Sequence, residues 1–139
     1  MISLCEKDPQ LNVIRLTSEE EGVASALGAW AGGVKSVLLT QSSGIGNIVN
    51  MLSIMSVCKA PLLILVTMRG EWGEFNPWQV PMGQAAKSVL ESMGVLVSRA
   101  DEVGEVYSLT EGAMKLAFNT YNVSAVLIGQ RALGAKSFK

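Results

Sequence analysis

Hydrophobic residues along the chain fall into two patterns, short continuous runs and longer segments with helical periodicity. The run LLILVT at residues 62–67 is continuously apolar, as expected for a parallel strand that is buried on both faces. In the segment before it, Ile48, Leu52 and Met55 recur every three or four positions and predict one apolar face of a helix. These patterns predict strands at 12–17, 35–40, 62–67, 95–98 and 124–128, and helices between Ser18 and Gly32 and at 44–57, 84–93 and 101–121.

Strands and helices alternate along the whole chain, without a repeat, a linker or a low-complexity tract between them. Such alternation predicts an α/β fold with three layers, α/β/α, around a mostly parallel central sheet. A chain of 139 residues suits one domain, so residues 1–139 are expected to share one core. In the last helix, we expect four apolar positions to face that core: Val106, Leu109, Ala113 and Leu116.

Apolar residues make up 49% of the chain, charged residues make up 17%, and the net charge is −1. This balance, without a basic cluster, argues against nucleic acid as a partner. The longest apolar run, residues 60–66, is too short to span a bilayer, so the apolar content indicates a large core and a large subunit interface. The polar start lacks a signal-peptide pattern, and Cys5 and Cys58 lack CxxC spacing, so we expect a reduced, cytoplasmic protein.

The chain contains no histidine. This excludes the Ser-His-Asp triad and removes the usual general base and the commonest metal ligand. We therefore expect no metal site in this chain. Any chemistry has to use carboxylates, lysines, backbone amides or a bound cofactor.

A glycine-containing turn, TQSSGIGNIVN at residues 40–50, joins a predicted strand to a predicted helix. It lacks the third glycine of a dinucleotide-binding turn, and no Gly-Lys-Ser/Thr follows it, so a phosphate cradle is not indicated. Two interpretations of Gly44 and Gly46 remain open. Either the turn requires positive φ angles, or it lets the backbone approach a flat ligand closely.

Three consecutive glutamates, Glu19 to Glu21, follow Thr17 and Ser18 at the predicted start of a helix. Ser18 with Glu21, and Thr17 with Glu20, match the spacing of a capping box. Acidic residues in a first turn also complement the helix dipole, which accounts for most of this cluster. One of the three carboxylates is nevertheless expected to face the carboxyl ends of the strands, where ligands bind in open parallel sheets.

A loop rich in glycine, proline and aromatic residues spans residues 69–81, directly after the most apolar strand. Its Arg69 is placed either to clamp an anionic ligand or to pair with Glu71 or Glu74. The loop is too apolar to lie wholly in solvent and predicts a lid or a subunit contact. The residues that carry this prediction are Trp72, Phe75 and Trp78.

The order and spacing of several motifs resemble those of one enzyme family. The motifs are SEEEGVA at 18–24, GAW at 28–30, QSSGIGNIVN at 41–50, PLLILV at 61–66, RG at 69–70, PMG at 81–83 and AVLIGQRALG at 125–134. Together they resemble the pyrimidine-binding domain of thiamine diphosphate-dependent decarboxylases, most like the sulfopyruvate and phosphonopyruvate decarboxylases. The resemblance covers almost the whole chain.

The resemblance implies a role for several residues. Glu19, nine residues before Gly28, would be the catalytic glutamate that hydrogen-bonds N1′ of the cofactor's aminopyrimidine ring. Arg69 would contact the anionic groups of a small 2-keto acid substrate. The cofactor pocket would be lined by Gln41, Ser43, Gly44, Gly46, Asn47 and Asn50.

The family holds the cofactor's diphosphate through Mg²⁺ with a Gly-Asp-Gly motif, which is absent from this chain. The resemblance therefore implies a separate β-type subunit that supplies this half of the site, in a homo- or hetero-oligomer, and no activity without it. Ser42 and Met68 stand where relatives often have Asn and His. The family also has a helix and a strand ahead of residue 12, so we expect a truncated start or a position filled by a partner.

Two other classes of protein remain as alternatives. The first is a non-catalytic binding or scaffold domain of the same fold that has no functional partner. The second is a flavodoxin-like domain that binds an anion at the Gly44 turn.

Overall fold

A computed structural model describes residues 2–134 and contains one four-stranded sheet with the order β1-β2-β4-β3. Every pair of neighbouring strands is parallel. The strands are β1 (Val37–Gln41), β2 (Leu62–Thr67), β3 (Leu96–Ala100) and β4 (Val123–Ile128). The prediction of a mostly parallel sheet is therefore confirmed.

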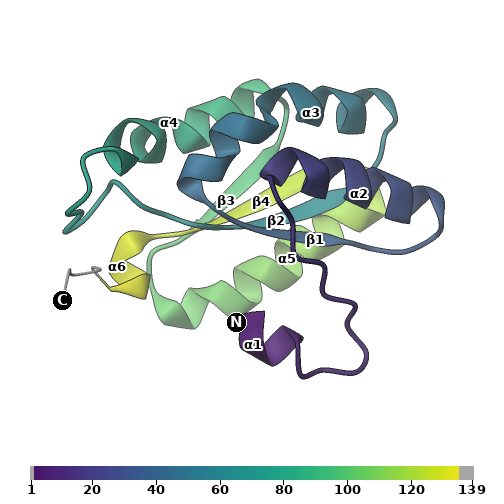
Figure 1. Cartoon of the computed structure of the whole chain (residues 1–139), viewed down its shortest axis with the longest axis horizontal. Helices are drawn as coiled ribbons and strands as arrows, with labels where there is room; N and C mark the ends of the chain where they lie inside the picture. The colour runs from purple at the N-terminus through teal and green to yellow at the C-terminus, as the bar shows by residue number, and fades with distance from the viewer. Residues whose placement is uncertain (1, 135–139) are drawn as a thin grey trace.

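Helices cover both faces of the sheet and complete the expected three layers (Figure 1). The first face carries α2 (Glu19–Ala31), α3 (Ile45–Val57) and α4 (Gln79–Ser92). The opposite face carries α5 (Val106–Thr120). The remaining short elements are α1 (Ile2–Cys5), η1 (Ser42–Gly44), η2 (Val103–Glu105) and α6 (Gln130–Leu133). Within residues 2–134, none of the helices combines the length and apolar composition needed to cross a bilayer.

Burial of the strands explains the two hydrophobic patterns. The central strand β4 is buried at every position, and β2 is buried at every position except its last. The helix α3 buries its predicted face, because Ile48, Leu52 and Met55 are each at most 1% exposed. In α5, however, Leu116 is 43% exposed, and the inward positions after Ala113 are Ala117 and Phe118. The inward prediction for Leu116 was wrong because the buried stripe continues from Ala113 at a spacing of four residues.

The structure also corrects the predicted strand at 12–17 and the predicted start of α4. Residues 12–17 form no strand, and Val13 and Ile14 are exposed. A strand requires a neighbour for its backbone hydrogen bonds, and β1, the edge strand on that side, pairs only with β2 among the described residues. The helix α4 begins at Gln79, earlier than predicted, and includes Pro81. Proline is tolerated there because N–H groups in the first turn of a helix have no partner within the helix.

The core of the larger face gives a direct test of the fold. Replacing Ile48 with alanine removes a fully buried side chain between α3 and the sheet and should lower the free energy of unfolding by about 2–5 kcal/mol. Ile54 lies on the same helix but is 41% exposed, so Ile54→Ala should cost about 1 kcal/mol or less. Urea denaturation measures both values, and equal losses would contradict the burial described here.

Candidate functional site

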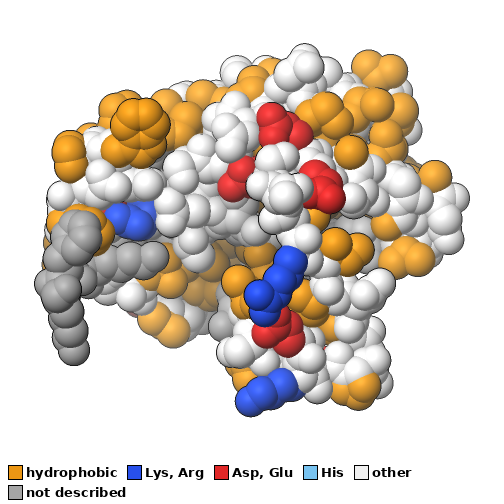
Figure 2. Space-filling model, viewed as in Figure 1, with side chains coloured by type: hydrophobic (Ala, Val, Ile, Leu, Met, Phe, Trp, Pro, Cys, Tyr) orange, Lys and Arg blue, Asp and Glu red, His pale blue; other side chains and the backbone are white. Residues whose placement is uncertain are grey.

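An open groove of about 640 Å³ lies at the carboxyl ends of the strands. It is lined by Glu19, Ser43, Gly44, Asn47, Pro77, Trp78, Pro81 and Met82. Figure 2 shows acidic side chains gathered over the start of α2, and hydrophobic side chains over the start of α4 and the loop before it. The groove therefore has a polar wall, from α2 and the η1–α3 turn, and an apolar wall, from the loop before α4 and the first turn of α4.

The polar wall depends on a close contact between α2 and the turn before α3. Glu19 is the first residue of α2, and its Oε2 accepts a hydrogen bond of 2.8 Å from Nδ2 of Asn47. A Cβ atom on Gly44 would collide with the Glu19 carboxylate and the Thr40 hydroxyl. Gly44 itself has a φ of −70°, so the positive-φ interpretation was wrong. The glycine permits close approach, here to a carboxylate.

The three glutamates at the start of α2 have different environments. Glu21 turns back, and its Oε2 accepts hydrogen bonds from the Thr17 hydroxyl at 2.6 Å and the Thr17 N–H at 2.8 Å. These bonds lower the pKa of Glu21, and the bond from the Thr17 hydroxyl has the larger effect. Ser18 makes no side-chain cap, so the full capping box with Glu21 does not form, although the Ser18 N–H bonds to Glu21. Thr17 pairs with Glu21 and not with Glu20 as predicted. Glu20 is exposed, which leaves Glu19 as the carboxylate that faces the groove.

The other expected cofactor-binding residues are placed unequally. Ser43, Gly44 and Asn47 line the groove. Gln41 lies beside it and donates from Nε2 to the Ser43 hydroxyl at 3.0 Å and to Oε1 of Gln79 at 3.1 Å. This pair of bonds connects the turn after β1 to the start of α4.

Two expected residues lie outside the groove lining. Gly46 lies beside α4, where an added Cβ would be 3.2 Å from the sulfur of Met82. Asn50 is exposed farther along α3. Sequence reasoning missed Met82 and Pro81 as groove residues, although their Pro-Met-Gly motif was one of the signals of family resemblance.

Arg69 is bound by Glu74, so the ion-pair interpretation is confirmed. Nε of Arg69 donates to Oε2 of Glu74 at 2.7 Å, and Nη2 donates to Oε1 at 2.5 Å. The two side chains are only 10% and 4% exposed. Hydrogen bonding to Glu74 raises the pKa of Arg69, and the same bonds hold the pKa of the Glu74 carboxyl well below its usual range. The guanidinium is thus occupied at the position where a substrate anion was expected.

A second ion-pair cluster lies at the ends of β3 and β4. Nη1 of Arg99 donates to Oε1 of Glu71 at 2.5 Å, and its Nε donates to Oδ1 of Asp101 at 2.9 Å. The hydrogen bonds that Arg99 donates to Glu71, and then those to Asp101, raise the pKa of Arg99. Sequence reasoning missed this cluster because Glu71 and Arg99 are distant in the chain and meet only when β3 is added beside β4.

The aromatic residues of the loop lie partly in solvent. Trp72 is 51% exposed, Phe75 is 38% exposed and Trp78 is 81% exposed. Trp78 and Pro77 also line the groove. That these aromatic residues form a lid or a subunit contact stays a prediction.

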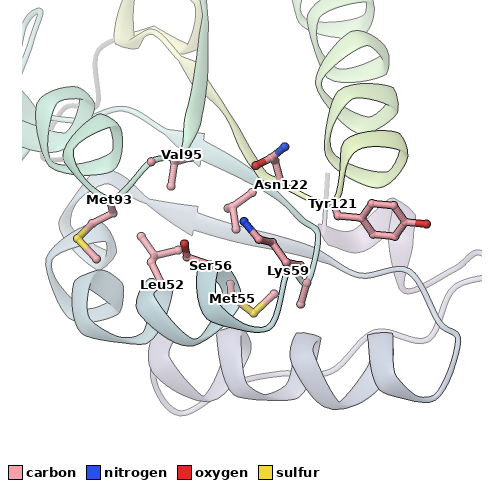
Figure 3. Close-up of a pocket in the computed structure, with 11 residues that line it drawn as sticks. Leu52, Met55, Ser56, Lys59, Met93, Val95, Tyr121 and Asn122 are labelled. Atoms are coloured by element: carbon pink, nitrogen blue, oxygen red, sulfur yellow. The ribbon is translucent and has the colours of Figure 1, made fainter.

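A small cavity lies at the opposite, amino-terminal edge of the sheet (Figure 3). Its volume of about 40 Å³ has room for a few water molecules and is too small for a cofactor. Leu52, Met55 and Val95 contribute to its lining, and Figure 3 shows Tyr121 directed away from it. Across residues 2–134, His, Cys, Asp and Glu side chains form no group of three that could hold a metal ion. The groove at the carboxyl edge is therefore the candidate site.

Comparison with known proteins places the chain in a family. Residues 2–137 match the family described as pyruvate flavodoxin/ferredoxin oxidoreductase, thiamine diphosphate-binding. The chain belongs to this family. The resemblance found from the sequence motifs is therefore confirmed, and the groove lies in a thiamine diphosphate-binding domain.

Curated proteins of similar sequence are named as decarboxylases. The sulfopyruvate decarboxylase subunit alpha of Methanococcus maripaludis is 35% identical over 92% of this chain and 77% of that protein. The sulfopyruvate decarboxylase of Methanosarcina acetivorans is 36% identical over 85% of this chain and 30% of that protein. The phosphonopyruvate decarboxylase of Streptomyces viridochromogenes is 34% identical over 66% of this chain and 23% of that protein. The chain thus spans most of an alpha subunit but less than a third of the two longer relatives.

A solved structure of more distant sequence has the same fold. The 2-oxoglutarate:ferredoxin oxidoreductase from Magnetococcus marinus superposes with a TM-score of 0.67 over 88% of this chain and 22% of that chain. The sequences are 18% identical, so this likeness concerns the fold alone.

The contact at Gly44 can be tested by adding one methyl group. Gly44→Ala should lower the free energy of unfolding by about 1–3 kcal/mol, because the new Cβ displaces the Glu19 carboxylate or Thr40. Gly112 lies inside α5 with nothing within 4 Å of an added Cβ, so Gly112→Ala should stabilise the protein by up to about 1 kcal/mol. Thermal and urea unfolding measure both, and a stabilising Gly44→Ala would refute the contact.

The low pKa of Glu74 predicts an acid-sensitive fold. Because the folded-state pKa lies below the ordinary value of 4.5, the ion pair stabilises the protein above that pH, and the stabilisation is lost as the pH falls below it. The free energy of unfolding should therefore decrease between about pH 5 and pH 3, and it should decrease less steeply in Glu74→Gln. Denaturation across this pH range, with Glu111→Gln as a surface control, measures the two slopes. Equal slopes in wild type and Glu74→Gln would exclude Glu74 as a cause.

Proposed function

We propose that this chain is the pyrimidine-binding subunit of a thiamine diphosphate-dependent 2-keto acid decarboxylase. The observation that carries the proposal is the Glu19 carboxylate, which is held by Asn47 over Gly44 at the edge of the groove. The groove suits an aminopyrimidine ring, because it combines a carboxylate acceptor with an apolar wall from Pro77 and Met82. Such a site offers a hydrogen-bond partner to a ring nitrogen and a surface for its flat face.

In this proposal Glu19 exchanges a proton with N1′ of the aminopyrimidine. Asn47 donates to Oε2 of the carboxylate, while Oε1 lies against Gly44, which lines the groove. Gly44 keeps the space beside the carboxylate free of a side chain. When bound, thiamine diphosphate supplies the electron sink that loss of carbon dioxide from a 2-keto acid requires.

We propose that a second, β-type subunit binds the diphosphate end of the cofactor through Mg²⁺. The chain contains no Gly-Asp-Gly motif, and the relatives from three archaea that resemble it along most of its length are named as subunit alpha. The exposed Trp78 at the rim of the groove offers an apolar surface to such a partner. The chain alone is then inactive.

The names of the relatives support sulfopyruvate or phosphonopyruvate as the substrate. Both are small 2-keto acids with a second anionic group. Arg69, the expected ligand of that group, is bound by Glu74, so the substrate's anion is proposed to find its cationic partner on the other subunit.

The test is to combine the chain with the β subunit of an archaeal sulfopyruvate decarboxylase, thiamine diphosphate and Mg²⁺. Release of carbon dioxide from sulfopyruvate and from phosphonopyruvate is then measured. Glu19→Gln should lower kcat by about 10²–10⁴-fold, because the amide cannot exchange a proton with the ring nitrogen. Size-exclusion chromatography should show the same complex for variant and wild type.

Glu20 supplies the matched control, since it is the next residue on the same helix and is exposed. Glu20→Gln should retain the activity of the wild type. If a fully active complex keeps its rate in Glu19→Gln, the assigned role of Glu19 is wrong. A complex that forms but binds no cofactor would favour the non-catalytic scaffold.

A further inference from the structure

The loop between β2 and α4 is organised around one buried carboxylate. Glu74 accepts hydrogen bonds from five donors, and its side chain is 4% exposed. The donors are Nε and Nη2 of Arg69, the N–H groups of Gly70 and Asn76, and Nε2 of Gln130, at 2.7, 2.5, 3.0, 3.0 and 3.1 Å. A buried carboxylate is tolerated only when its charge is paired and its oxygens are hydrogen-bonded, and here both conditions are met.

The five donors come from three parts of the chain. Arg69 follows β2, Gln130 opens α6 directly after β4, and Gly70 and Asn76 belong to the loop itself. By binding the N–H groups of both Gly70 and Asn76, one carboxylate closes the loop and fixes it to the ends of two neighbouring strands. The loop is also bound to α4, because Nε2 of Gln84 donates a hydrogen bond of 2.8 Å to the Gly70 carbonyl.

The closed loop leads directly into the apolar wall of the groove. Oδ1 of Asn76 accepts a hydrogen bond of 3.1 Å from the N–H of Trp78, and the N–H of Gln79 donates to the Asn76 carbonyl at 3.0 Å. Pro77 and Trp78 line the groove across from Glu19. The loop that Glu74 binds therefore leads into this wall, although Glu74 is not among the groove residues.

We propose that Glu74 is a positioning residue, which holds Pro77 and Trp78 at the groove without contacting the bound ligand. This inference rests on the proposed function only for the identity of that ligand. The proposed role of Arg69 also differs from the expected one, because Arg69 anchors Glu74 and does not bind substrate.

Hydrogen–deuterium exchange of the isolated chain tests the anchoring. In Glu74→Gln, the backbone amides of residues 70–76 and 78 should exchange at least about tenfold faster. The neutral side-chain amide leaves Arg69 without its charge partner and cannot accept hydrogen bonds from all five donors. Exchange in α3 should remain unchanged. The matched control is Glu111→Gln, which removes a surface pair between Glu111 and Lys115 on α5 and should leave residues 70–78 as in the wild type.

Glu74→Asp provides a second test in case Glu74→Gln does not fold. It keeps the charge but shortens the side chain, so fewer of the five hydrogen bonds can form, and the exchange rate of residues 70–78 should lie between those of wild type and Glu74→Gln. Unchanged exchange in both folded variants would overturn the proposal.

A second measurement examines the ligand in the complex with the β subunit. Titration with thiamine diphosphate should give a Kd at least about tenfold higher in Glu74→Gln, and rate measurements should give a KM for the cofactor that is at least about tenfold higher. The kcat at saturating cofactor should stay within about twofold of the wild type. A variant whose loop exchanges faster but whose Kd is unchanged would overturn the positioning role. If the wild-type complex binds no thiamine diphosphate, the proposed function fails, whereas the exchange experiment still decides whether Glu74 anchors the loop.

Discussion

The close approach of Glu19 to Gly44 is the constraint on which the candidate site depends. Parallel strands end at one edge of the sheet, so the helix starting after residue 18 and the turn after β1 meet there. A side chain at position 44 would occupy the place of the Glu19 carboxylate. With glycine in that position, Asn47 from the first turn of α3 can reach Glu19 and hold it at the groove.

Polar interactions in this fold are concentrated at the same edge. The two central strands are apolar apart from Ser124 and the terminal Thr67, and they are buried almost throughout. Where these strands end, Glu74 binds Arg69 and Gln130, and the Gln130 side chain in turn accepts from the N–H groups of Glu71 and Trp72. The apolar strands thus end in a hydrogen-bonded polar edge, and a binding site requires such supporting hydrogen bonds.

Much of this arrangement was predictable from periodicity and spacing. The apolar run at 62–67 predicted a strand with the same bounds as β2. The apolar face predicted for the helix at 44–57 is the face that α3 buries. The strand at 12–17 was wrong because local pattern does not reveal whether a neighbouring strand exists. For the site, the family resemblance singled out Glu19, whose catalytic role stays a prediction. The Glu71–Arg99 pair depends on strand order, which periodicity does not contain.

The ion pairs near the groove bear on the proposal that another chain completes the site. A diphosphate requires cations or a metal ion, and at this edge Arg69 and Arg99 are already paired, whereas Arg131 in α6 is exposed. Arg69 is bound by Glu74, and Arg99 is bound by Glu71 and Asp101. Releasing either arginine would leave a carboxylate without its partner, which is costly in the buried case of Glu74. Under the proposed function, the groove residues would bind the uncharged, ring end of the cofactor, and the proposed β-type subunit would bind its anionic end.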